Sequence, residues 1–197
     1  MSKDAPGVRY AEIERESGGT TVRVVLDLDG ERQATVQTGV GFFDHLLGVF
    51  AYQGCFDLGV STDGGLHVDD HMTLEDVGVC IGQAIRQALG EGDGIDVYGT
   101  EHAPVDEALA RVVVDVSARP CLVFDVQFTV ERIGEMSTEA VEEFFRAVAN
   151  HAQITIHVHQ LAGKSNHHIT EAIFKAFGRA LRKAVHKLDG KAKGRLG

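Results

Sequence analysis

The chain has few cysteines, no long apolar run and fewer basic than acidic side chains. Its three cysteines are far apart and flanked by apolar residues, so we expect reduced thiols in the core and exclude a disulfide scaffold. No run approaches the roughly 18 apolar residues of a membrane span. The opening MSKDAPGVRY lacks the apolar segment of an export signal, so we expect a cytoplasmic protein without a membrane partner.

The charge balance argues against a nucleic-acid partner. Asp and Glu number 29 against 19 Lys and Arg, which gives a formal net charge of −10. Basic residues gather only in the C-terminal FGRALRKAVHKLDGKAKGR, a pattern typical of the solvated face of a last helix and its tail. A lysine-containing tail also suits the clamping of a phosphate group.

A long-period repeat runs through the chain. At an offset of 96, HMTLEDVGVCIGQAIRQALG aligns with HHITEAIFKAFGRALRKAVH, so that His71 meets His167 and Glu75 meets Glu171. The repeat predicts a single domain over 1–197, made of two halves at about 8–92 and 93–188 with a flexible tail at 189–197.

Each half predicts strands followed by a helix, a strand and a second helix. Strands are expected at 9–16, 20–28, 32–38, 55–62, 98–104, 108–117, 121–130 and 153–160, and helices at 42–54, 72–89, about 137–150 and about 168–187. Short turns between consecutive strands indicate antiparallel pairing. We therefore predict an α+β fold, an internal duplication of a strand-rich β-β-β-α-β-α half with its sheets packed against helices.

The repeated motif carries metal-binding chemistry. In His-x-x-x-Glu at a helix start, both side chains lie on one helix face, because residues four apart are helical neighbours. The pairs His71/Glu75 and His167/Glu171 meet this spacing, and His168 points about 100° away from His167. Histidine and carboxylate donors suit manganese, iron, zinc or nickel.

Several motifs together resemble one family over nearly the whole chain. They are LDLDG, TGVGFFDHLL, VDDHMTLED, PVDEALARVVVDVSARP, EMSTEAVEEFFRAVAN, ITIHVHQLAGKSNHHITEAIFKAFGRALRKA and KAKG. In this set and order, the chain resembles imidazoleglycerol-phosphate dehydratase. The resemblance implies a hydro-lyase that converts imidazole glycerol phosphate to imidazole acetol phosphate in histidine biosynthesis. It also implies a homo-oligomer of about 24 chains built from trimers, with about two Mn²⁺ ions per chain in sites shared between subunits.

The same resemblance implies roles for individual residues. The implied metal ligands are His45, His71, Glu75, His167, His168 and Glu171, with Glu143 as an additional candidate. Glu16, Glu75 and Glu171 are the implied catalytic carboxylates. Glu16, Arg119, Lys175 and Lys193 are the implied substrate-binding residues, and the three cations engage the phosphate.

Some positions depart from the family pattern. The resemblance implies histidine at three positions that hold other residues here: Met72, Glu143 and Gln53. It implies arginine at the position of Val97. Ala118 stands in place of a glycine. A thioether is a poor ligand for manganese, so the departures allow for one metal ion or none.

These departures leave three alternative functions. In the first, the chain is a working dehydratase with a rearranged site that uses Glu143, His67, His151 or His159 as a substitute ligand. Alternatively it is a divergent paralogue that acts on another small imidazole or phosphate compound. In the third case it is a catalytically impaired protein that keeps the oligomeric cage.

Overall fold

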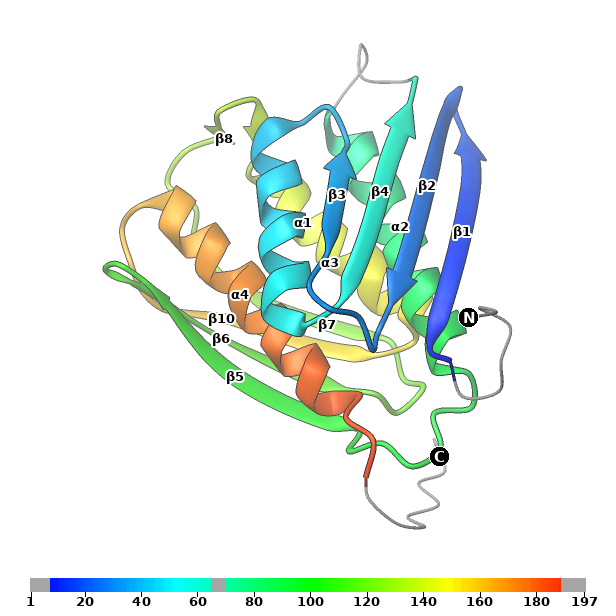
Figure 1. Cartoon of the computed structure of the whole chain (residues 1–197). Helices are drawn as coiled ribbons and strands as arrows, with labels where there is room; N and C mark the ends of the chain where they lie inside the picture. The colour runs from blue at the N-terminus through cyan, green and yellow to red at the C-terminus, as the bar shows by residue number, and fades with distance from the viewer. Residues whose placement is uncertain (1–7, 65–69, 189–197) are drawn as a thin grey trace.

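The structure, a computed structural model, describes residues 8–64 and 70–188. Two four-stranded sheets enclose a layer of four helices, and a short hairpin lies at one end (Figure 1). The predicted α+β class is therefore confirmed. The strands are β1 (Tyr10–Ser17), β2 (Thr20–Asp27), β3 (Ala34–Gln37), β4 (Asp57–Asp63), β5 (Tyr98–Val105), β6 (Ala108–Asp115), β7 (Cys121–Asp125), β8 (Arg132–Ile133), β9 (Met136–Ser137) and β10 (Thr155–Ala162). The helices are α1 (Gly41–Gly54), α2 (Asp70–Leu89), α3 (Glu139–Ala152) and α4 (Asn166–Ala184).

The two large sheets have the same connectivity. Their strand orders are β1-β2-β4-β3 and β5-β6-β10-β7. This shared order is what two copies of one β-β-β-α-β-α half would produce. The predicted tail at 189–197 lies outside the described residues.

The predicted antiparallel pairing is confirmed for β1 with β2 and for β5 with β6. The prediction is wrong for the third strand of each half, β3 and β7. Strand β3 pairs in parallel with β4, and β7 pairs in parallel with β10. The helix between β3 and β4 makes a crossover connection, which places β4 between β2 and β3.

The core lies between the sheets and the helix layer. Helices α1 and α2 contact the first sheet, α3 and α4 contact the second, and the helices meet as the pairs α1–α4 and α2–α3. Along β2 the buried residues Val22, Val24 and Leu26 alternate with partly exposed ones, as expected for a strand with one buried face. Phenylalanines fill the space between the helices: Phe43, Phe50, Phe144, Phe145, Phe174 and Phe177 are all buried.

Glycines allow the paired helices to run close together in the same direction. A Cβ atom at Gly82 of α2 would lie 2.9 Å from the carbonyl oxygen of Val148 in α3. A Cβ at Gly178 of α4 would collide with the Phe50 carbonyl of α1. Both pairs are parallel, and Figure 1 shows that all four helices begin at the same end of the layer.

Two sequence-based expectations are wrong in detail. Strand β7 ends at Asp125 instead of residue 130, because the following backbone bonds to side chains: Gln160 accepts from the Gln127 N–H and Asn166 from the Thr129 N–H. The cysteines are all free, as expected, but of the three only Cys80 is buried: Cys55 is half-buried after α1, and Cys121 is exposed on an edge strand.

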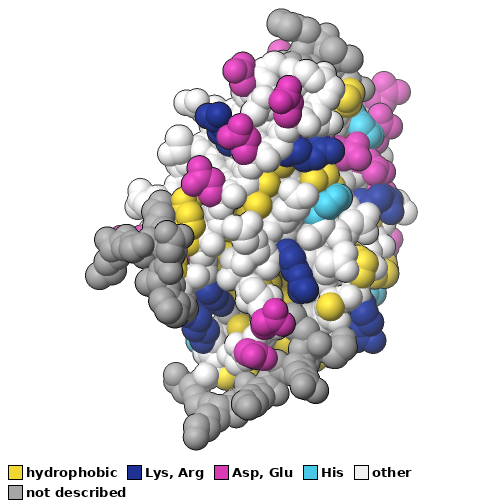
Figure 2. Space-filling view, turned by 90° about the vertical axis from the view of Figure 1, so that its right-hand side faces the viewer, with side chains coloured by type: hydrophobic (Ala, Val, Ile, Leu, Met, Phe, Trp, Pro, Cys, Tyr) yellow, Lys and Arg dark blue, Asp and Glu magenta, His cyan; other side chains and the backbone are white. Residues whose placement is uncertain are grey.

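Of the helices described, none combines the length and apolarity that a membrane crossing requires. Figure 2 shows the face of the molecule on the β1 side. Acidic and basic side chains are interspersed on this face, and apolar side chains are exposed between them. The basic side chains on this face form no continuous stripe.

Candidate functional site

The seam between the first turns of α1 and α4 brings three predicted ligands together. The Nε2 atom of His45 lies 3.4 Å from Oε2 of Glu171, and Nε2 of His167 lies 3.6 Å from the same oxygen. The other oxygen of Glu171 lies 2.7 Å from Nζ of Lys175, one turn further along α4. Burial alone would raise the pKa of Glu171, but the hydrogen bonds from Lys175 and His45 hold it below its usual value. Glu171 is therefore an ionised carboxylate at the centre of this cluster.

Phe42 positions the two imidazoles of this cluster. Its ring centroid lies 4.4 Å from that of His167 and 6.2 Å from that of His45. Ring contacts of this kind restrict the orientation of each imidazole. The sequence analysis missed Phe42, which is the first phenylalanine of TGVGFFDHLL and occupies the half-buried position beside the core residue Phe43.

His168 points away from this cluster toward the turn between β5 and β6. Its ring is nearly perpendicular to that of His167, at 88°. Its Nδ1 lies 2.7 Å from Oε2 of Glu107, and its Nε2 lies 3.6 Å from Oδ2 of Asp106. The adjacent histidines therefore serve two different surroundings, as the 100° rotation per residue predicts.

Glu107 was also missed by the sequence analysis. Its Oε1 accepts hydrogen bonds from the backbone N–H groups of Ser165 and Lys164, which precede α4. The bond from Ser165, the bond with His168 and the bond from Lys164 lower the pKa of Glu107 to about 2. The carboxylate thus joins the β5–β6 turn to the start of α4 while it orients His168.

The seam between α2 and α3 carries the sister residues. His71 is half-buried at the start of α2, and Glu75 is exposed one turn later. Glu143 of α3, which aligns with His45 in the repeat, pairs with Arg146 of its own helix at 3.3 Å. Glu143 therefore contacts a cation of its own helix, whereas His45 contacts a carboxylate of the neighbouring helix at the α1–α4 seam.

Met72 lies on the surface beside the β1–β2 turn. It is 46% exposed, and its Cε atom lies 3.6 Å from the position of a Cβ atom built on Gly18. Glu16, the predicted proton carrier, is an exposed residue near the end of β1, two residues before that glycine. Arg15, the preceding residue, pairs with Asp76 of α2, so the alternation of β1 directs Glu16 to the outer face of the sheet.

Arg119, a predicted phosphate-binding residue, lies far from the start of α4 in the same chain. Arg119 lies beside the first residue of β10, because the Thr155 hydroxyl donates to its backbone oxygen at 2.8 Å. Helix α4 starts shortly after the last residue of this strand, Ala162. Seven strand steps separate the two ends by about 23 Å. Lys193 lies outside the described residues.

Two of the proposed substitute ligands, His151 and His159, lie in the described part of the chain away from the first turns of the helices. His151 lies two turns after Glu143 on α3, about 12 Å along the axis. His159 lies on the strand β10, with its Nδ1 3.4 Å from Oδ2 of Asp125. His67 falls outside the described residues.

The donor types at the α1–α4 seam fit a hard divalent cation. Manganese is bound by imidazole nitrogen and carboxylate oxygen, and His45, His167 and Glu171 supply both. Within residues 8–64 and 70–188, however, no group of three or more His, Cys, Asp or Glu side chains is arranged so that it could hold a metal ion. The donors of one chain fit in type, and a complete coordination shell requires further donors or a rearrangement.

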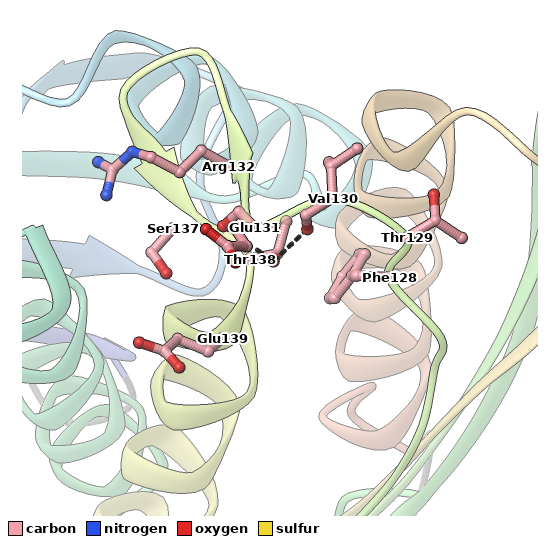
Figure 3. Close-up of a pocket in the computed structure, with 8 residues that line it drawn as sticks. All are labelled: Phe128, Thr129, Val130, Glu131, Arg132, Ser137, Thr138 and Glu139. Atoms are coloured by element: carbon pink, nitrogen blue, oxygen red, sulfur yellow. Dashed lines mark hydrogen bonds between the residues drawn. The ribbon is translucent and has the colours of Figure 1, made fainter.

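A cavity of about 550 Å³ lies between the β7–β8 connection and the start of α3 (Figure 3). Residues 128–132 and 137–139 line it, and none of them is a predicted site residue. Thr138 closes the loop by donating to the Val130 carbonyl at 2.8 Å. Arg132, 3.2 Å from Asp70, ties the β8–β9 hairpin to the first residue of α2. We therefore assign this region a bracing role for the helix start.

Comparisons with known proteins cover most of the chain. The family model for imidazoleglycerol-phosphate dehydratase matches residues 38–181. The imidazoleglycerol-phosphate dehydratase of Acetivibrio thermocellus is 52% identical over 92% of this chain and 93% of its own length. That of Methylorubrum extorquens is 50% identical over 96% of both chains.

Two solved structures are also similar. The imidazoleglycerol-phosphate dehydratase of Staphylococcus aureus has a TM-score of 0.82 at 38% identity, over 90% of this chain and 99% of that one. The enzyme of Pyrococcus furiosus, solved in complex with (S)-C348, has a TM-score of 0.79 at 29% identity, over 92% and 97% of the two chains. The resemblance drawn from the motifs is thereby confirmed, and the chain belongs to the imidazoleglycerol-phosphate dehydratase family.

Proposed function

We propose that the chain is a cytoplasmic hydro-lyase that converts imidazole glycerol phosphate to imidazole acetol phosphate in histidine biosynthesis. The observation that carries this proposal is the identity of about half of all positions, over more than nine-tenths of the chain, with enzymes of that name. The ligand cluster of His45, His167 and Glu171 at the α1–α4 seam supports it independently.

The residues that would hold manganese lie at the helix starts. They are His45, His71, Glu75, His167, His168 and Glu171. A bound divalent cation would stabilise negative charge on the imidazole ring of the substrate. Glu107 would keep the Nε2 atom of His168 available, because it occupies Nδ1 at 2.7 Å.

The chain's own carboxylates would carry the proton. Dehydration removes hydroxide from the carbon beside the ring and a proton from the next carbon, and the resulting enol becomes the ketone. Glu16, Glu75 and Glu171 are candidates for accepting that proton. The bond from Lys175 keeps Glu171 ionised, which suits either proton acceptance or metal binding.

A site shared between copies of the chain would complete the set of metal-binding and phosphate-binding residues. Arg119 and the start of α4 lie at opposite ends of β10, about 23 Å apart. A small phosphate ester is shorter than this distance, so Arg119 and His167 of the same chain are poorly placed for one substrate molecule. We therefore include in the proposal a homo-oligomer of about 24 chains built from trimers, in which one copy supplies phosphate-binding residues to another.

The test combines activity, metal content and mass on the purified full-length protein. We expect dehydration of imidazole glycerol phosphate, about two manganese ions per chain by elemental mass spectrometry, and a large closed oligomer by native mass spectrometry. An intact oligomer that contains metal but leaves the substrate unchanged would refute the activity and favour the divergent paralogue. A metal-free, inactive oligomer that does not bind added manganese would favour the impaired cage protein.

A further inference from the structure

A cationic pocket lies at the far end of the α1–α4 seam from the histidines. It has a volume of about 360 Å³ and is formed by the β2–β3 connection, the last turn of α1, strand β5 and the second half of α4. Four of the side chains that line it are cationic: Arg32, Arg179, Arg182 and Lys183. Glu101 is the acidic residue of the lining. These charges come from three separate segments of the chain and converge only in the folded protein.

Glu101 holds two of the cations in place. Its carboxylate oxygens lie 3.3 Å from Nε of Arg179 and 2.7 Å from Nζ of Lys183. Burial would raise the pKa of Glu101, but the hydrogen bonds from Lys183 and Arg179 outweigh it and lower the pKa. One negative charge is therefore shared between two positive ones.

The side-chain contacts that the structure describes for Arg32 are with neutral groups. The backbone of Arg32 is in the left-handed region, at φ 71°. Its Nε lies 3.3 Å from Sγ of Cys55, and its guanidinium lies 5.0 Å from the centre of the Tyr52 ring. No carboxylate described in the structure lies within ion-pair distance of this guanidinium, so its charge is unmatched at the pocket.

The charge balance of the pocket is positive even after its surroundings are included. Four cations face one carboxylate, and Asp29 outside the lining reaches Arg182 only at 4.0 Å while it also pairs with Arg9 and Lys187. The ends of α1 and α4 each contribute about half a negative charge. A net charge of about +2 remains, in a chain whose formal charge is −10.

We propose that this pocket binds a dianionic phosphate group, either inorganic phosphate or the phosphate of a small monoester. Arg32 would approach the ligand from the β2–β3 side, and Arg179 and Lys183 from α4. Arginine and lysine donors in this arrangement give charge-assisted hydrogen bonds to phosphate oxygens. Eight residues of α4, about 12 Å, separate Arg179 from Glu171. The pocket is therefore distinct from the histidine cluster. Lys175 precedes Arg179 by one turn, about 6 Å, and Gln53 of the lining stands where the resemblance implies histidine. None of the four cations is a predicted substrate-binding residue, so the proposal goes beyond the proposed function.

The experiment titrates inorganic phosphate into the full-length protein by calorimetry at constant ionic strength. Arg32→Gln should weaken phosphate binding roughly tenfold or more, the scale of losing a charged hydrogen bond. Glu101→Gln should strengthen binding, because it removes the competing carboxylate and releases Arg179 and Lys183. Arg86→Gln, an exposed arginine on α2 away from the pocket, removes the same charge as the first variant and should leave binding unchanged.

The opposite effects of the two pocket variants make the test specific. Circular dichroism confirms that each variant is folded, and Arg32 is a surface residue whose replacement leaves the core intact. Equal binding by the wild type, Arg32→Gln and Glu101→Gln would overturn the proposal, as would no binding by the wild type. Glycerol 3-phosphate titrated in parallel separates the two ligand sources, since tighter binding than phosphate supports a monoester and weaker binding supports the free ion.

Arg119→Gln and Lys175→Gln separate this site from the predicted substrate site. Phosphate binding that persists in both variants supports the cationic pocket. Binding that is lost in these variants but kept in Arg32→Gln would overturn the pocket proposal while leaving the dehydratase proposal intact. Failure of the dehydration assay alone would leave the phosphate titration unaffected.

Discussion

The Nδ1 atom of His168 lies 2.7 Å from a carboxylate oxygen of Glu107, a residue 61 positions earlier in the chain. The same carboxylate accepts two backbone N–H groups at the start of α4. Glu107 therefore fixes both the ring orientation of a predicted metal ligand and the position of the helix that carries it.

This pair should make the stability of the metal-free protein depend on pH. Glu107 has a pKa of about 2 instead of 4.5, so its contribution is complete above pH 4.5 and is lost as the pH falls toward 2. The pKa of His168 is raised from 6.5, chiefly by its hydrogen bond to Glu107, so its contribution is complete below pH 6.5 and is lost as the pH rises through the folded-state pKa. The pair stabilises the fold most between pH 4.5 and 6.5.

Urea-unfolding midpoints measured across this range test the prediction. Glu107→Gln should weaken the dependence of the unfolding midpoint on pH at both the acidic and the alkaline ends of the range. Glu91→Gln, in an exposed turn, should keep the wild-type dependence. An unchanged profile in Glu107→Gln would show that the pair contributes nothing to the pH dependence.

Glu171→Gln should remove activity more than it removes stability. The change deletes the charge that meets His45, His167 and Lys175, and we expect the turnover rate to fall by about a hundredfold or more. Manganese content should fall in parallel if Glu171 is a ligand. Steady-state kinetics and elemental analysis on the same samples check both effects, with Glu91→Gln as the matched control. Full activity in Glu171→Gln would remove this residue from the site.

Met72→His should increase manganese affinity at the start of α2. Because Met72 is 46% exposed, the substitution should change the free energy of unfolding by no more than about 0.5 kcal/mol. Adding Glu143→His should increase the affinity further, since it replaces a second departure from the family pattern. Competition with a fluorescent chelator measures the affinity. A double variant with wild-type affinity would show that these positions do not contact the metal.

Ala118→Gly should stabilise the protein. Ala118 has a φ of 56°, in the left-handed region, where an L-residue with a Cβ atom is strained by roughly 1 kcal/mol. Part of this gain is offset by the greater freedom of glycine in the unfolded chain. Ala162→Gly, at an exposed strand position without a positive φ, should instead destabilise the protein. Urea unfolding of the two variants should therefore give shifts of opposite sign.

Local patterns predicted most of the secondary structure and part of the site. The alternating residues of β2 and the helical spacing of α2 depend on neighbours within a few positions, which the sequence displays directly. His167 and Glu171 meet for the same reason, since one helical turn sets their separation. The partner of β3 was predicted wrongly, because a crossover helix decides which strand lies beside it.

The sequence by itself determined the family, the α+β class and the pairing of His167 with Glu171 at the start of α4, because these depend on local periodicity and on residue types in order. The tertiary structure alone decided that Glu107 holds His168, that Phe42 packs on His167, and that Arg32 joins the cations of α4. Each of these contacts joins residues far apart in the chain. Their distances are set by how helices and sheets pack, which no local pattern encodes.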